Sequence, residues 1–385
     1  MTMKISQRHI LRRDKWLLSC LTWVPLLIAL TIWGVFSAGI ARNLPIGVVD
    51  LQHSQLSRKL IQSLDASATM AVKHHFTSTS EAKDAMIEGI VYAYAVIPPQ
   101  FDQDIFQQRQ PQLSVFYNSQ YILVGKLINS AFVQAQGYFD AQLEAMAILA
   151  KGSTTPLTAV GKAVPVSTQI TALFNRNNNY AQFLVTAIVP AIWQIGIVVS
   201  TILLLSANFR IYGATSQDIF AFLTPSPVYS LSKILSQYIP VFMLQGALFL
   251  YGFYVVLDWP MEGSFTLLLF AQLITIIACM IMGALFFFLT MDAARAMSFA
   301  GAFTAPSFAF MGITFPVSDM NMLAQAWRNL LPISHYIEVQ VGQASYGASV
   351  ADSLITLSPM LAYTIPLLLV TALIDKQRHM ARKSL

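Results

Sequence analysis

Three glutamines inside long apolar stretches are the polar side chains most open to a functional interpretation. Gln194, Gln245 and Gln272 each lie near the middle of a different stretch. A polar group costs free energy in lipid, so it tends to face protein or a water-filled cavity. Hydrogen bonding between helices, worth about 0.6–2 kcal/mol, is the simpler interpretation. The functional alternative is a weakly polar lining, and these glutamines are therefore our substrate-path candidates.

The sequence contains no motif of a metal site or of a catalytic site. His53, His74 and His75 form the one histidine group, without the ligand spacing or carboxylate support of a metal site. Asp102 and Asp104 fit solvated charge in a loop or at a helix start. No Ser, His and Asp residues carry a local hydrolase signature. We expect no metal, no cofactor and no catalytic residue.

The sequence contains no motif for nucleotide hydrolysis. A P-loop needs Gly-x-x-x-x-Gly-Lys-[Ser/Thr], so that backbone N–H groups can surround phosphates. The Gly-Lys pairs at positions 125 and 161 are followed by Leu127 and Ala163, without the upstream glycine. The chain should not hydrolyse ATP by itself. No acid or base lies deep in an apolar stretch, which argues against a proton-driven carrier.

The composition is that of an integral membrane protein. Of 385 residues, 56% are hydrophobic and 11% are charged, against about 45–50% and 25% in soluble chains. So few charges cannot cover a water-facing surface, and disorder is excluded because disordered segments are rich in charge. Cys20 and Cys279 lie in separate apolar stretches, so no disulfide framework is expected.

Six stretches are long and apolar enough, or nearly so, to cross a membrane as helices, which takes about 20 residues. They are residues 16–36, 183–205, 234–257, 265–289, 297–315 and 360–374. Pro306 interrupts the fifth and Pro366 the sixth, which is tolerable where neighbours satisfy the freed carbonyl. A signal peptide is the alternative for the first, but its apolar run is too long and contains Trp23 and Trp33.

The basic residues orient these spans, because Lys and Arg collect on the cytoplasmic side. Both termini are basic, and Arg210, Lys233 and Arg295 fall on the same side as the termini. The charged residues of the loops 258–264 and 316–359 are mainly acidic. Every loop then fits one topology, with both termini inside and residues 43–180 outside. The net charge of +5 is accordingly a topology signal, and no nucleic-acid partner is expected.

Residues 43–180 have a soluble composition, with equal numbers of basic and acidic residues. Strand-like segments at 45–51, 69–73, 91–97 and 112–117 alternate with helix-like segments at 54–67, 80–89 and 121–149, and 162–173 is a last extended piece. Ser80 resembles a helix cap and Gly89 a helix stop. The length is usual for one domain, so we predict a small α/β domain.

The predicted fold is a mostly α, polytopic membrane protein with six transmembrane helices and an inserted extracytoplasmic α/β domain. Residues 1–42 would form an interfacial helix and the first span, 43–180 the external domain, and 181–385 the membrane domain. The last would include an inner loop at 206–233 and an outer hairpin at 316–359.

The inner loop is long enough for a short helix on the membrane face. Thr224 can cap such a helix and Pro225 fits its first turn, while Lys233 lies where the next span begins. A rigid helix of this kind suits docking into a groove on another protein. Near the N-terminus, residues 6–16 are basic with interspersed apolar residues, which suits an interfacial helix on an anionic leaflet.

Four stretches carry a family resemblance. They are Pro-Ile-Gly-Val-Val-Asp at 45–50; Leu-Phe-Asn at 173–175 with Tyr180 and Phe183; Leu-Thr-Pro-Ser-Pro at 223–227 with Lys233; and Gly-Ile-Thr-Phe-Pro at 312–316 with Met320 and Leu-Pro-Ile-Ser-His-Tyr at 331–336. In order and spacing they resemble the permease subunits of type-2 ABC exporters, in the branch with a large external domain after the first span. The family's acidic Glu-Arg-Glu-x-Gly-Thr run is missing at 209–215, which leaves open how the ATPase is contacted.

The resemblance implies the membrane half of an ATP-driven exporter in a bacterial inner membrane, with both termini cytoplasmic. The implied partners are a separate ABC ATPase subunit, docked at Thr224, Pro225 and Lys233, a second permease that is identical or a sister chain, the lipid bilayer and a periplasmic adaptor protein. The implied substrates are drugs or other amphipathic compounds.

A non-transporting membrane scaffold or receptor, with the external domain as a binding module, is the alternative function. Its inner loop would have no ATPase partner. A membrane-embedded enzyme would need clustered titratable residues near the membrane face, and the sequence shows none. The substrate and the choice between homodimer and heterodimer stay open.

Overall fold

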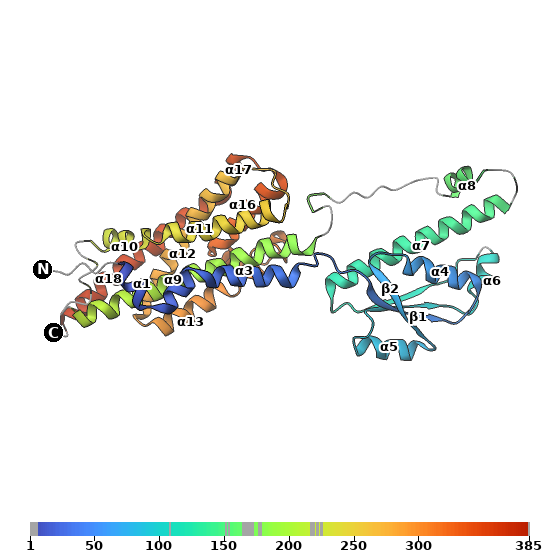
Figure 1. Ribbon diagram of the computed structural model, residues 1–385, viewed down its shortest axis with the longest axis horizontal. Helices are drawn as coiled ribbons and strands as arrows, with labels where there is room; N and C mark the ends of the chain where they lie inside the picture. Colours follow the sequence, from blue (N-terminus) through green and yellow to red (C-terminus); the bar gives the residue numbers. More distant parts are fainter. Residues whose placement is uncertain are drawn as a thin grey trace. The chain divides into compact units, whose positions relative to one another are not determined.

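The computed structural model describes residues 7–107, 109–150, 152, 155–163, 173–175, 179–215, 220, 223 and 226–383 (Figure 1). The chain is mostly helical and has one small sheet, which confirms that part of the predicted fold. It divides into two compact units. We call residues 40–171 the α/β unit, and Met1–Gly39 with Ala172–Leu385 the helical unit.

The α/β unit is built on a sheet with the strand order β2-β1-β3-β4. β1 (Leu44–Asp50) is parallel to β2 (Met70–Phe76) and β3 (Ala93–Ile97), and β4 (Ser114–Tyr117) is antiparallel to β3. Parallel strands cannot be joined by a tight turn. Helices α4 (Gln55–Asp65) and α5 (Thr79–Ile87) therefore connect β1 to β2 and β2 to β3. All four predicted strands are present.

Alternation along β1 divides its side chains between two faces of the sheet. Ile46 and Val48 pack in one cluster with α4 and with α7 (Ile122–Ala150), whereas Val49 packs with Ala82 of α5. Figure 1 shows α4 and α7 on one side of the sheet and α5 on the other. Helices thus cover both faces, which is why β1 is apolar almost throughout.

Serine hydroxyls determine where α4 begins. The hydroxyls of Ser54 and Ser57 each accept a hydrogen bond from the other residue's N–H at 2.9 Å, a reciprocal capping box. The buried Ser57 donates to Asp50, and Ser54 donates to Asp102 at 2.6 Å. Asp102 thus lies in the first turn of α6 (Phe101–Phe106) and joins it to α4.

Two details of the predicted α/β unit differ. The cap of α5 is Ser78, not Ser80, because the Ser78 hydroxyl accepts from the Glu81 N–H. Thr77 donates its N–H and its hydroxyl to the Glu81 carboxylate at 3.0 and 2.9 Å, which lowers the pKa of that carboxyl. The predicted extended piece 162–173 begins inside α8 (Pro156–Ala163), and its residues 164–172 lie outside the described residues.

Within the described residues, the helical unit has four helices long and apolar enough to cross a membrane, or five if a bent pair counts as one. The four are Tyr180–Gly213 in α9 (Tyr180–Thr215), Ile239–Val256 in α11 (Ile239–Tyr251) with its final π-helical turn, α12 (Phe265–Thr290), and Val350–His379 in α17 (Val350–Leu357) and α18 (Thr364–Lys383). The bent pair is α2 (Lys15–Leu21) and α3 (Trp23–Phe36), which meet at 47°.

The prediction of six spans is not confirmed. The fifth, 297–315, consists of α13 (Ala293–Thr304) and the single turn α14 (Ser307–Phe310), both shorter than a span. Pro306 has no N–H to continue the helical ladder, so the helix breaks before it. The third predicted span also begins too early, because α10 (Pro227–Ser236) is a separate helix.

Two glycines let helices of this unit approach closely. A Cβ on Gly283 of α12 would lie 2.8 Å from the Val198 carbonyl oxygen and the Thr201 Cβ, both on α9. A Cβ on Gly246 of α11 would lie 2.6 Å from Oε1 of Gln272 on α12. Small residues at helix crossings are typical of membrane bundles, where close packing drives association. α12 is therefore packed tightly against both neighbours.

Candidate functional site

A helix begins inside the core of the helical unit. After α15 (Met322–Asn329), α16 (Pro332–Tyr346) starts with six consecutive buried residues. Its first N–H groups would lack partners there, but Pro332 has none, Ile333 donates to Gln194 Oε1 at 2.9 Å, and Ser334 donates to the Leu331 carbonyl at 3.2 Å. These partners make a helix start tolerable at that depth.

The three predicted substrate-path glutamines lie apart and tie helices together. Besides Gln194, Gln272 donates to the Tyr336 hydroxyl of α16 at 3.0 Å, and Gln245 donates to the Leu21 carbonyl at 2.9 Å. All three are at most 4% exposed, and each keeps one buried amide atom without a partner. None of them lines a cavity identified in the described part of the chain. This geometry favours the interhelical interpretation, and a substrate-path role stays a prediction.

The hydrogen bond from Gln245 gives the Leu21 carbonyl, at the bend between α2 and α3, a donor that the helix itself does not supply. In an unbroken helix the Leu21 carbonyl would accept from the N–H of residue 25, but residue 25 is Pro25. The proline removes that donor and bends the helix, and the Gln245 amide supplies a donor in its place.

We expect Gln245→Leu to destabilise the helical unit by about 1–2 kcal/mol, because the Leu21 carbonyl then has no donor. Restoring the N–H with Pro25→Ala should recover much of that loss. Thermal unfolding of both single variants and the double variant in detergent measures the coupling energy. Strict additivity would show that Gln245 and Pro25 do not share the Leu21 carbonyl.

The sequence interpretation missed two further glutamines that hold α16. Gln340 donates to the Thr186 carbonyl of α9 at 2.8 Å, and Gln343 accepts from the Ser264 N–H at 2.8 Å. Both are 1% exposed. The only signal was two glutamines three residues apart in the predicted outer hairpin, and the partners of both lie far away in the sequence.

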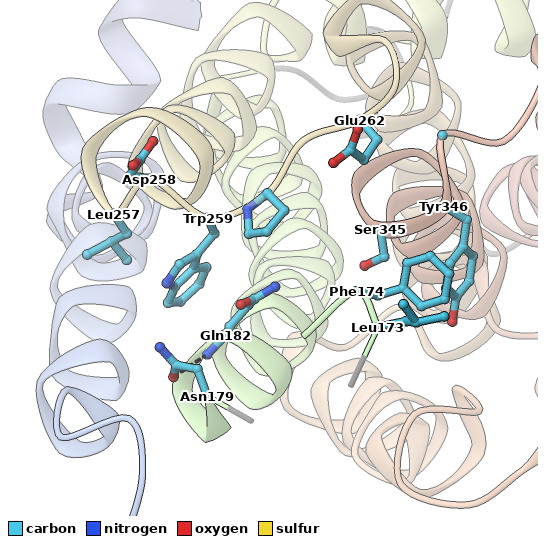
Figure 2. Close-up of a pocket in the computed structure, with 12 residues that line it drawn as sticks. Leu173, Phe174, Asn179, Gln182, Leu257, Asp258, Trp259, Glu262, Ser345 and Tyr346 are labelled. Atoms are coloured by element: carbon cyan, nitrogen blue, oxygen red, sulfur yellow. Dashed lines mark hydrogen bonds between the residues drawn. The ribbon is translucent and has the colours of Figure 1, made fainter. Parts of the chain in front are cut away.

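A cavity of about 820 Å³ opens where α9 begins, α11 joins α12 and α16 ends (Figure 2). Figure 2 shows Trp259 and Gln182 on one side and Ser345 and Tyr346 on the other, with the Glu262 carboxylate above the space between them. The volume is within the range of small-molecule sites, about 300–1,000 Å³. The cavity is therefore a candidate ligand site in the described part of the helical unit.

The lining of this cavity is aromatic and acidic. Trp259 is 8% exposed and stacks on Phe253 at 5.6 Å between ring centroids, while Phe174 contacts Tyr346 edge-on at 4.8 Å. Its charged lining residues are Asp258 and Glu262, neither of which forms an ion pair with any described residue. Aromatic faces and a carboxylate attract an organic cation, so the lining suits an amphipathic molecule with a positive charge.

The candidate docking residues lie around α10. This helix begins at Pro227, with Ser226 at the N-cap. Thr224 and Pro225 lie outside the described residues, so their predicted cap is untested. Lys233 is described and exposed, in the last turn of α10.

The exposed side of α10 carries Val228, Tyr229 and Lys233, which we call the α10 ridge. The Lys233 ammonium lies 5.9 Å from the Tyr229 ring centroid, one turn apart, as in a cation–π pair. Behind α10, Arg378 of α18 donates to the Leu223 carbonyl at 2.6 Å. The opposite side of α10 carries the buried residues Leu231, Ile234 and Leu235, which hold the helix against the bundle, so that the ridge projects from a fixed position.

α1 (Gln7–Arg13) lies at the same end of the helical unit as α10 and the end of α18 (Figure 1). Gln7 accepts from the Tyr238 hydroxyl at 3.1 Å and exchanges hydrogen bonds with Asn208. Among the described residues, no group of three His, Cys, Asp or Glu side chains could hold a metal ion.

Comparison with known proteins identifies the chain's relatives at family level. One family model, described as ABC-2 family transporter protein, matches residues 15–373. No curated protein and no solved structure matched. The matched range includes the apolar helices of the helical unit, the α/β unit and the α10 ridge. The chain belongs to the ABC-2 family of transporter proteins and is a multi-pass membrane permease of that kind.

Proposed function

We propose that the chain is the membrane subunit of an ATP-driven exporter for amphipathic compounds, with ATP hydrolysis supplied by a separate subunit. The family match from residue 15 to residue 373 carries the proposal, because permeases of this family work with an ABC ATPase. Export, rather than import, and the class of substrate are the parts that we add. The working unit would be a dimer with a second copy or a sister chain.

The charge at the α10 end supports the orientation. Arg13, Arg210, Lys233 and Arg378 all lie on elements that meet there, and basic residues favour the cytoplasmic side. In the proposed orientation both termini would be cytoplasmic in a bacterial inner membrane, and the α10 ridge would face the ATPase. The α/β unit would then be extracytoplasmic, available to an adaptor protein.

The 820 Å³ cavity supports the class of substrate. In our orientation it lies at the outer end of the bundle, on the way out. The segments 258–264 and 316–359 carry five acids and one base, Arg328, so the outer end attracts cations. An amphipathic cation would contact Trp259 and Tyr346 with its apolar part and Glu262 with its charge.

We expect Glu262→Gln to lower transport of such a cation about fivefold, since charges about 4 Å apart in water attract by about 1 kcal/mol. The assay is ATP-dependent accumulation of tetraphenylphosphonium, below saturation, in inside-out vesicles that hold the chain and its ATPase. Asp319→Asn is the matched control, because it removes an exposed acid that does not line the cavity. No ATP-dependent accumulation by the wild type would argue against export of these cations, and equal loss in both variants would exclude the cavity.

A further inference from the structure

A second cavity, of about 520 Å³, lies between the N-terminal helices and the end of α9. The lining residues come from α1, from the α1–α2 junction and from the last turns of α9. They are Ile10, Arg13, Asp14, Lys15, Trp16, Ala207, Arg210 and Ile211. Three bases and one acid thus surround a space at the end of the apolar bundle.

The one acid of this cavity is already engaged. Asp14 accepts from the Leu17 N–H at 3.1 Å as the cap of α2, and its other oxygen pairs with Arg210 at 2.7 Å. Arg13 and Lys15 form no ion pair with any described carboxylate, and both are exposed. The cavity therefore keeps an excess of positive charge, which suits a phosphate group.

An apolar track on α2 and α3 begins at the same cavity. Trp16 is 80% exposed, and it is followed at spacings of seven, four and three residues by the exposed Trp23, Leu27 and Leu30. The spacings of four and three place Trp23, Leu27 and Leu30 along one side of α3, while Trp16 lies on α2 at the cavity, before the bend. A tryptophan beside a charged cavity is typical of the membrane interface, and the track below it can accommodate hydrocarbon.

We propose that this cavity binds the headgroup of an anionic phospholipid whose acyl chains lie along the apolar track. A free phosphate would satisfy Arg13 and Lys15 but leave the track unused, so the combination favours a lipid. The bound headgroup would hold the α1–α2 junction against the end of α9, in addition to the Asp14–Arg210 pair. The site depends on the chain's membrane location alone and not on the transported substrate.

The test uses the full chain, extracted in detergent and studied by native mass spectrometry with added phosphatidylglycerol or phosphatidylcholine. We expect selective retention of phosphatidylglycerol. Arg13→Gln with Lys15→Gln should weaken its binding about 25-fold, from about fivefold for each basic residue near a headgroup. Arg12→Gln with Lys376→Gln removes the same charge from exposed side chains outside the cavity and should weaken binding less than threefold.

Competition with inorganic phosphate distinguishes a site for a lipid headgroup from a site for free phosphate. We expect millimolar phosphate not to displace phosphatidylglycerol, because it cannot occupy the apolar track. Displacement of phosphatidylglycerol by phosphate would show that the cavity is a phosphate site and not a lipid site. Equal retention of both lipids by the wild type, or equal weakening by the two pairs of substitutions, would overturn the proposal. Arg13→Lys with Lys15→Arg should retain binding, which separates loss of charge from misfolding.

Discussion

Gly283→Ala should destabilise the helical unit by about 1–3 kcal/mol, the cost of forcing a methyl group into a packed interior. The new Cβ would lie 2.8 Å from a backbone oxygen of α9, and backbone cannot move aside as the end of a flexible side chain can. Gly196→Ala, in α9 itself, is the control, since a Cβ there meets nothing within 4 Å. Helix propensity predicts that this control is neutral or slightly stabilising.

The chain provides its own reporter for this comparison. Cys279 is fully buried in α12, one turn before Gly283, and Cys20 is the only other cysteine. In a Cys20→Ser background, a maleimide dye would react with Cys279 as the bundle opens on heating. A lower unfolding temperature for Gly283→Ala than for Gly196→Ala is expected. Equal temperatures would mean that α9 and α12 do not cross closely at Gly283.

Removing the α10 ridge should reduce capture of the ATPase at least tenfold while leaving membrane insertion intact. Tyrosine is one of the residue types that most often carry an interface's binding energy, and Lys233 lies beside Tyr229 on the ridge. We therefore expect Tyr229→Ser with Lys233→Ser to reduce co-purification of the ATPase from membranes. Lys233→Arg keeps the charge and should be mild.

The control for the ridge is Tyr251→Ser. It makes the same tyrosine-to-serine change at an exposed position, the last residue of α11, at the end of that helix remote from α10. It should leave ATPase capture unchanged. If the ridge variant captured as much ATPase as the wild type at equal expression, α10 would not be the docking element. Equal losses in the ridge variant and in Tyr251→Ser would indicate a general defect.

Local patterns predicted most elements because each depends on neighbouring residues. The strand β1 and the helices α4, α9 and α12 follow from apolar periodicity and length. The predicted fifth span is not confirmed, because the effect of Pro306 depends on what surrounds it: a proline in a membrane helix can be tolerated or can end the helix. Periodicity does not distinguish these outcomes.

The candidate site could not be predicted from local patterns, because its residues have partners far away in the sequence. Gln194, Gln245 and Gln272 stood out as polar groups in apolar stretches, but their partners are 64 to 224 residues away. The link between Gln245 and the carbonyl left free by Pro25 requires the register of two helices. The cavity around Trp259 likewise joins three distant segments, and no local pattern indicates that they meet.

The most direct measurement of the central claim is to purify the chain from its native membranes and assay what accompanies it. We predict a P-loop ATPase in equal amount, and ATP hydrolysis that is lost when the ATPase is removed and restored when it is added back. The chain alone should hydrolyse no ATP. A chain that purifies without any nucleotide-hydrolysing partner, or that hydrolyses ATP by itself, would contradict its assignment as the membrane half of an ATP-driven exporter.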